Sequence, residues 1–259
     1  MGAVMKNREK YKFDYFTIDH YKEILRLARD LGFEFILHKD SFVEDRKDII
    51  WRHDVEFSPV QALKMARMES ELGIRATYFW QTHCDMYNVY HKFFSDILRE
   101  MKSLGHHIGL HFDSHFWDVK DAAQLCRCIE IDKDYFEKVF DLQIDTFSFH
   151  NTNPFVLSCE EYRYGGLINV YSRFFKDHYQ YCADSTGYWR YEVLDEVLRD
   201  QNTRHLQVLI HDAMWSDAVM SPRQRVMHSI QSEADRVKKY YDEDLVQFGA
   251  KNVDDDVVL

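Results

Sequence analysis

The chain has 259 residues, of which 46% are hydrophobic and 15% aromatic, and it contains nine glycines and three prolines. This composition is typical of a folded globular protein and excludes long disordered or Gly/Pro-rich linker segments. A formal net charge of -11 argues against nucleic acid as a partner, because a polyanion would be repelled. We therefore expect one domain over residues 1–259.

The N-terminal residues MGAVMKNREKYKFDYF carry charges where a signal peptide needs an apolar segment. No uninterrupted apolar run approaches membrane-spanning length. These features predict a cytoplasmic protein without a membrane span. The five cysteines form no CxxC pair, which excludes a zinc ribbon and predicts reduced thiols without a disulfide framework.

Helices are predicted where apolar residues recur at steps of three and four. Thr17, Ser58 and Ser221 are capping residues, and a proline directly follows each of the two serines. Gly32 and Gly73 mark the ends of the first two helices. The predicted helices are 17–31, 58–72, 88–104, 119–140, a segment that opens at 184–189 and runs to 199, and 221–245.

Short apolar runs between these helices predict strands. Their alternation with helices implies a parallel sheet. About seven parallel strands in one domain favour a (β/α) barrel, distorted or incomplete, over an open sheet, and residues 250–259 form a loose tail. The predicted strands are 33–37, 48–54, 76–81, 107–112, 145–149, 167–171 and 206–210.

Polar residues stand where four of these apolar runs end: Asp54, His111, His150 and His211. In a barrel of parallel strands those ends converge on one face, where catalytic residues lie. His115 follows His111 at a four-residue step, which lets two neutral imidazoles approach one divalent ion. An HxxxH pair alone is weak evidence in a chain with 14 histidines, but the four strand ends together indicate a shared metal or catalytic site.

In chain order the segments are WRHDVEFSP, ATYFW, GHHIGLHFDSH, FSFHNTNP, ADSTGYW and LQVLIHDAMW. This order resembles the polysaccharide deacetylases, the NodB-homology group also called carbohydrate esterase family 4. The resemblance covers residues 49–215, and it is greatest to the branch with an RHDVD-like first motif, which is associated with surface-polysaccharide biosynthesis. It implies a polysaccharide-deacetylase-like barrel with its motif-bearing core at 49–215.

The resemblance implies a divalent metal held by a carboxylate together with His111 and His115. Zn²⁺ is the first expectation, and Co²⁺, Ni²⁺ and Mn²⁺ accept the same ligands. His211 matches the histidine that protonates the leaving amine. Asp184 matches the aspartate that tunes the site, and Trp189 matches the tryptophan that walls the acetyl pocket.

The first motif departs from the family pattern, because His53-Asp54-Val55-Glu56 replaces the usual pair of adjacent aspartates. On a strand, positions 54 and 56 share one face and position 53 points away. We therefore expect Asp54 as the base and Glu56 as the metal ligand. The alternative has Asp54 on the metal, with His53 or Glu56 as the base.

The third motif, FSFHNTNP, also departs, since it lacks the arginine usual at this place. Arg52 or Arg190 could supply the missing charge. Arg52, His150 and Asn151 are therefore candidates for substrate contact, and so is Trp215 from the last motif. Each has a structural alternative: an ion-pair network around Arg52, hydrogen bonding at His150, and a core aromatic at Trp215.

Together these residues predict a metal-dependent hydrolase that removes an N-acetyl group from an amino sugar. The expected substrate is a precursor of a surface polysaccharide, of O-antigen or capsule type as in lipopolysaccharide biosynthesis. One alternative is a hydrolase of cyclic amides or imides on the same fold. Another is a catalytically silent barrel that binds glycan or scaffolds an assembly, which the altered first motif would favour.

Overall fold

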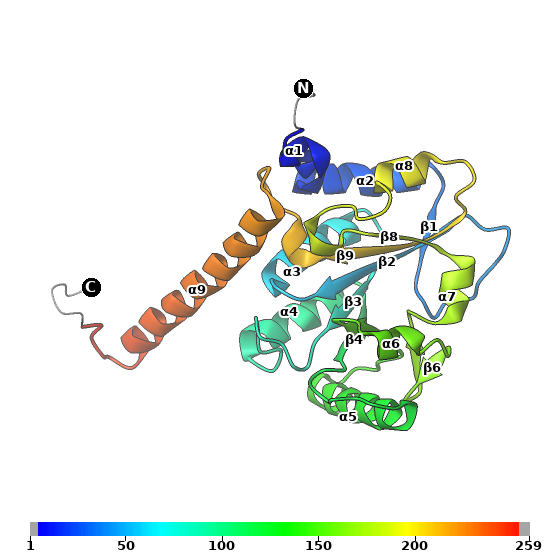
Figure 1. The fold of residues 1–259 in the computed structure, drawn as a ribbon. Coiled ribbons are helices and arrows are strands. Elements are labelled where there is room, and N and C mark those ends of the chain that lie inside the picture. Colours follow the sequence, from blue (N-terminus) through cyan, green and yellow to red (C-terminus); the bar gives the residue numbers. More distant parts are fainter. Residues whose placement is uncertain (1–4, 254–259) are drawn as a thin grey trace.

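One sheet of nine strands organises the chain in the computed structural model, which describes residues 5–253 (Figure 1). All neighbouring strands pair in parallel, except β6 with β7. The strands are β1 (Glu34–Ile36), β2 (Asp48–Val55), β3 (Thr77–Trp80), β4 (His107–Asp113), β5 (Thr146–His150), β6 (Arg163–Tyr164), β7 (Leu167–Asn169), β8 (Gln180–Ala183) and β9 (His205–His211).

The sheet is an incomplete barrel, which confirms the predicted fold class. Its strand order is β6-β7-β5-β4-β3-β2-β9-β8, and β1 pairs with the first half of β2. No ladder among the described residues joins β8 to β6 or β7, so the barrel stays open on that side. The order places β5, β4, β3, β2 and β9 side by side.

The helices begin where the caps predict. Thr17 accepts a hydrogen bond from the His20 amide, and Ser58 accepts one from the Gln61 amide. No helix within residues 5–253 has the length and apolarity needed to cross a bilayer. The α-helices are α1 (Asn7–Lys10), α2 (Ile18–Asp30), α3 (Pro59–Glu71), α4 (Lys92–Ser103), α5 (Ala122–Phe140), α6 (Pro154–Ser158), α7 (Arg173–His178), α8 (Leu194–Arg199) and α9 (Pro222–Gln247), and the 3-10 turns are η1 (Phe13–Phe16), η2 (Ser185–Gly187) and η3 (Asp212–Met214).

The predicted helix over 184–199 was wrong in its first part. Only η2 and, later, α8 are helical there. Thr186 and Gly187 have φ values of 65° and 87°, and this left-handed backbone interrupts a right-handed helix. The short strands β6 and β8 were not predicted. The predicted loose tail falls largely on residues 254–259, which lie outside those described.

Two apolar clusters lie on opposite faces of the sheet. The larger one fills the space between the outer face and the helices, with Trp51 and Tyr78 among its fully buried members. The smaller one joins Ile36, Ile50, Ile168, Phe175 and Tyr179. Because side chains alternate along a strand, Ile50 shares the inner face of β2 with residues 52 and 54. The inner face is thus apolar at one end and polar toward the carboxyl ends of the strands.

Gly109 in β4 allows a close approach that no other residue would permit. A Cβ atom there would lie 2.5 Å from Cδ1 and Cε1 of the buried Phe79 ring and 3.2 Å from Thr146 Oγ1. We predict that Gly109→Ala lowers the free energy of unfolding by about 1–3 kcal/mol, because the ring has no room to move. Urea denaturation followed by circular dichroism measures this. Adding Phe79→Leu should restore part of the loss, and an unchanged midpoint for Gly109→Ala would contradict the prediction.

Candidate active site

The carboxyl ends of neighbouring strands bring the predicted site residues to one edge of the sheet. Asp54 on β2 lies directly opposite His211 on β9, and His111 on β4 lies opposite Ser148 on β5. His150 is the last residue of β5. The convergence expected from the four strand ends is therefore present in the fold.

Glu56, His111 and His150 form a triangle of potential metal ligands. Glu56 Oε1 lies 3.0 Å from His111 Nε2 and 2.9 Å from His150 Nδ1, and the two nitrogens are 3.2 Å apart. Ligand atoms about 2.1 Å from a tetrahedral Zn²⁺ are roughly 3.4 Å apart, so a slight outward shift of these atoms would admit an ion. Among the described residues, these three side chains form the group whose ligand atoms lie close enough together to hold one metal ion.

The carboxylate of this triangle carries the charge that a metal site needs, whereas the His150 ring would have to release a proton to bind an ion. Burial alone would raise the pKa of Glu56, but hydrogen bonds from His111 and His150 and the charge of His211 hold it well below its usual value. Burial also disfavours the charged form of His150, yet the bond to Glu56 raises the pKa of His150. Glu56 is therefore an ionised carboxylate between two imidazoles, which is the charge that a divalent cation requires of a ligand.

Asp54 lies beside the triangle with one oxygen held and one free. Its Oδ2 accepts hydrogen bonds from Arg52 Nη2 at 3.1 Å and Ser148 Oγ at 3.2 Å, and it lies 3.8 Å from His111 Nε2. Its Oδ1 has no hydrogen-bond partner among the described residues. Burial opposes the charge of Arg52, but Asp54 and Tyr171 raise the pKa of Arg52, so the buried guanidinium stays protonated. Arg52 thus contacts Asp54 and is a permanent positive charge beside this carboxylate.

His211 is oriented by Asp184. His211 Nδ1 lies 2.6 Å from Asp184 Oδ1, and the His211 amide donates to the same carboxylate. Trp215 Nε1 donates to the other oxygen, Oδ2, at 2.8 Å. Burial would lower the pKa of His211, but the carboxylates of Asp184 and Glu56 raise it to about 10. Its Nε2 lies 4.0 Å from Glu56 Oε2, so the free edge of the ring faces the triangle.

Asp212 fixes the backbone that carries Glu56. It was not predicted as a site residue, and its place directly after His211 was the one signal that could have indicated it. The fully buried carboxylate accepts hydrogen bonds from three consecutive amides, those of Glu56, Phe57 and Ser58. Burial raises the pKa of Asp212, while these amides oppose that rise. Asp212 therefore holds the turn between β2 and α3 in one conformation.

A pocket of about 1060 Å³ opens beside Asp54, Glu56 and His211, which form part of its lining. His115 lines it rather than joining the triangle: its exposed ring places Nε2 2.8 Å from the carbonyl oxygen of Asn151. Asn151 Nδ2 in turn lies 2.9 Å from His150 Nε2. The lining includes Asp54, Glu56, His115, Asn151, Tyr171, Tyr181, Arg190, Tyr191 and His211.

The two tryptophans considered for substrate contact lie elsewhere. Trp189 and Trp215 are buried and pack with ring centroids 6.1 Å apart, and both pack against Phe16. Neither belongs to the residues that line the pocket. Trp215 reaches the site only through Asp184, whereas Arg190 and Tyr191, directly after Trp189, lie at the pocket.

His53 lies on the outer face of β2, in a second buried polar cluster. Its Nε2 is 2.7 Å from Glu69 Oε1, and Glu69 also accepts hydrogen bonds from Tyr21 and Tyr78. Although burial raises the pKa of Glu69, His53 and the other partners lower it overall. The cluster joins α2, α3, β2 and β3 behind the site, and it keeps His53 away from the pocket.

No known family model matches the chain, and no curated protein is found to be a relative. Among solved structures it is similar to a family 4 carbohydrate esterase from Bacillus anthracis, with 17% identity, 82% of this chain and 84% of that chain covered, and a TM-score of 0.44. The peptidoglycan deacetylase PdaC from Bacillus subtilis shows 14% identity, 80% and 98% coverage, and a TM-score of 0.42. A CE4 family pseudoenzyme from Bacillus anthracis shows 10% identity, 75% and 63% coverage, and a TM-score of 0.42. Because these similarities are low, the chemistry has to be inferred from the side chains of this chain.

The triangle predicts which histidines bind metal. His150→Ala should reduce Zn²⁺ affinity by about 100-fold or more, because it removes a ligand atom, whereas His115→Ala should reduce it by less than about tenfold. Isothermal titration calorimetry on the metal-free proteins measures both. Equal losses in the two variants would mean that His115 turns inward and binds the ion together with His111.

The Asp212 contacts predict that this residue sets the metal affinity without touching the ion. Asp212→Asn should lower Zn²⁺ affinity by about 10- to 100-fold, because the loop that carries Glu56 loses its anchor. Asp217→Asn is the matched control, since Asp217 lies nearby with its side chain 78% exposed. If Asp212→Asn lowers the melting temperature but leaves the metal affinity of the folded protein unchanged, Asp212 serves stability only.

Proposed function

We propose that the chain is a metal-dependent hydrolase that removes an N-acetyl group from an amino sugar. The observation that carries this proposal is the grouping of Glu56 with two imidazoles, close to Asp54 and His211. Of these groups, Glu56, Asp54 and His211 line one pocket. Three ligands that leave open positions are typical of catalytic metal centres, while fully ligated centres are structural. Asp54 and His211 then supply the two proton-transfer groups that amide hydrolysis needs.

The donor set suits a borderline ion such as Zn²⁺, because one carboxylate oxygen and two imidazole nitrogens are its common ligands. Glu56, His111 and His150 would hold the ion, and His115 at the pocket is the alternative ligand. When bound, a divalent ion supplies Lewis acidity to an amide carbonyl and to water. Burial raises the pKa of Glu56, but hydrogen bonds from His111 and His150 lower it overall, which favours the ionised carboxylate.

Asp54 is the proposed general base. Arg52 and Ser148 hold Oδ2, so the free Oδ1 is the atom that would accept the proton from an attacking water. Glu56 already bonds both imidazoles, which leaves it less suited to accept that proton. The alternative, with Asp54 as a ligand, is compatible with its 3.8 Å distance from His111 Nε2.

His211 is the proposed general acid. Asp184 engages Nδ1, so the second ring proton sits on Nε2, which faces the triangle. The raised pKa of His211 means that the ring carries this proton at neutral pH. It would pass the proton to the nitrogen of the leaving amine, and Asp184 would stabilise the imidazolium before that transfer.

The pocket is large enough for more than a single acetamide group. Its volume of about 1060 Å³ and its lining of Tyr171, Tyr181 and Tyr191 suit a sugar ring with attached groups, since aromatic faces and hydroxyl donors bind carbohydrates. We place the substrate among precursors of surface polysaccharides, of O-antigen or capsule type. This finer assignment rests on the resemblance of the first motif, WRHDVEFSP, to the RHDVD-like branch.

The direct test is acetate release from N-acetylated amino sugars, free, nucleotide-linked and oligomeric. Exhaustive chelation should abolish the release, and Zn²⁺ or Co²⁺ should restore it. Asp54→Asn should lower kcat by about 100- to 10,000-fold, because the base is lost while the ligands remain. His228→Ala is the matched control, since His228 lies in a different groove beside α9.

The outcomes separate the alternatives. Release that survives chelation, or that persists in Asp54→Asn, would contradict the mechanism. Turnover of small cyclic amides with no acetate from any sugar would assign the site to cyclic amide hydrolysis. No stoichiometric divalent metal, together with no turnover on either substrate class, would favour the catalytically silent barrel that binds glycan or scaffolds an assembly.

A further inference from the structure

The long helix α9 exposes most of its large apolar side chains to solvent. It leaves the sheet after η3 and extends beyond the other elements at its C-terminal end (Figure 1). Only Arg225 and Ser229 of its 26 residues are buried. A surface helix normally turns its apolar face toward the body and its polar face toward solvent.

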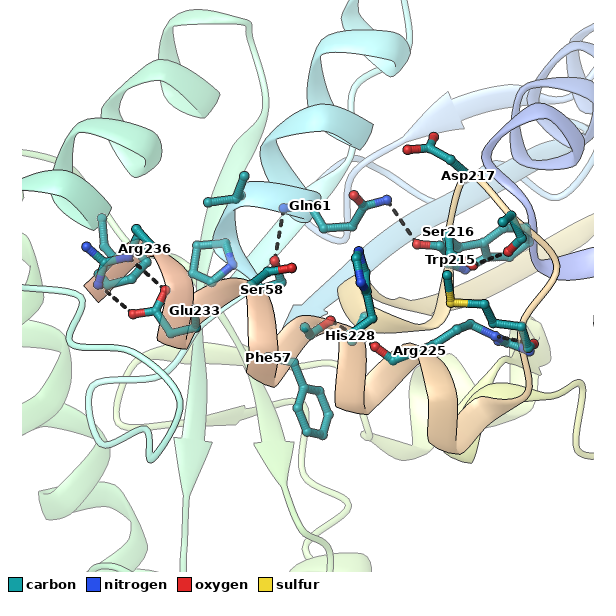
Figure 2. Close-up of a pocket in the computed structure, with 18 of the residues that line it drawn as sticks. Phe57, Ser58, Gln61, Trp215, Ser216, Asp217, Arg225, His228, Glu233 and Arg236 are labelled. Atoms are coloured by element: carbon teal, nitrogen blue, oxygen red, sulfur yellow. Dashed lines mark hydrogen bonds and ion pairs between the residues drawn. The ribbon is translucent and has the colours of Figure 1, made fainter. Parts of the chain in front are cut away.

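The side of α9 that faces the body is mainly polar, apart from Val226, which packs against the larger apolar cluster. Arg225 donates from Nη1 to the carbonyl oxygens of Met214 and Gly187, and the Arg236 guanidinium lies 4.8 Å over the Phe93 ring of α4. A groove of about 540 Å³ separates the helix from the body, and Figure 2 shows its α9 wall, which includes Arg225, His228, Glu233 and Arg236.

The opposite side carries a continuous apolar stripe. Its members recur at steps of three, four, three and four residues: Met227, Ile230, Ala234, Val237 and Tyr241. Met227, Val237 and Tyr241 are 50%, 50% and 55% exposed. Ala234 follows Arg225 by about 2.5 turns, so the stripe points away from the body. We call these five residues the outer stripe.

We propose that the outer stripe is the seam of a parallel coiled coil between α9 and the same helix of a second copy of this chain. The 3-4 spacing is the heptad pattern, in which apolar side chains of one helix pack between those of another helix. A broad apolar face would suit a groove or a membrane surface, but this stripe is narrow. Each copy would cover the other's exposed stripe.

The charges beside the stripe fit a second copy in the parallel orientation. With Met227 and Ile230 at the first two core positions, Glu233 and Lys238 take the flanking positions that face each other between parallel helices. Glu233 lies directly before Ala234, at the border between the groove and the outer stripe. Lys238 forms no ion pair among the described residues, and Glu233 pairs only with Arg236 of its own helix. An antiparallel pairing would instead bring Lys238 near Lys238. The next core position is Asp244, so the seam ends at Tyr241.

Sedimentation equilibrium of the full chain at micromolar concentrations tests the proposal, and a mass of two chains is expected. Val237→Glu should weaken the dimer by roughly 100-fold, because association would bury two carboxylates at the seam. Val246→Glu is the matched control: Val246 is 78% exposed on the same helix but outside the stripe, and this variant should remain dimeric.

The charge pair tests the orientation. Lys238→Glu should weaken the dimer, since it would face Glu233 of the second copy, and adding Glu233→Lys should restore it. Circular dichroism confirms that each variant is folded. A wild-type chain that is monomeric throughout, a dimeric Val237→Glu variant, or no rescue by the double exchange would overturn the proposed parallel seam.

Discussion

The hydrogen bonds that Glu56 accepts from two imidazoles hold the site together, because removing any of these three groups from water without a partner costs free energy. The carboxylate of Glu56 is half-buried and loses part of its hydration, and the hydrogen bonds that it accepts from His111 and His150 offset this loss. Asp212 then fixes the backbone amide of Glu56 and the two that follow. The position of the Glu56 carboxylate between the two imidazoles therefore depends on the conformation of the turn between β2 and α3.

Strand β2 connects this arrangement to the rest of the fold, since its two faces carry two separate polar clusters. On the inner face Arg52 pairs with Asp54, and on the outer face His53 pairs with Glu69. All four side chains are buried, and each pair offsets part of the cost of removing its charges from water. The central strand is thereby held from both sides, and this restricts the movement of the residues at its carboxyl end.

The helix α9 differs from the longer helices of the fold in which of its side chains are buried. In α2, α3, α4 and α5 the buried positions are mainly apolar and face the sheet, as amphipathic packing requires. In α9 the two buried residues are Arg225 and Ser229, and large apolar side chains face outward. The candidate active-site pocket and this outward stripe are formed by different elements of the fold.

Local sequence patterns determined the helices with strong caps, the parallel strands and the convergence of Asp54, His111, His150 and His211, because period and strand ends are local properties. The alternation of side chains along a strand also predicted correctly that His53 points to the other face of β2 from Asp54 and Glu56. Only the tertiary structure decided that His150 joins Glu56 and His111 while His115 bonds to Asn151, and that Trp189 and Trp215 pack outside the pocket. The register between β4 and β5 sets the distance between His111 and His150. The two residues are far apart along the chain, so their spacing in the sequence does not determine this register.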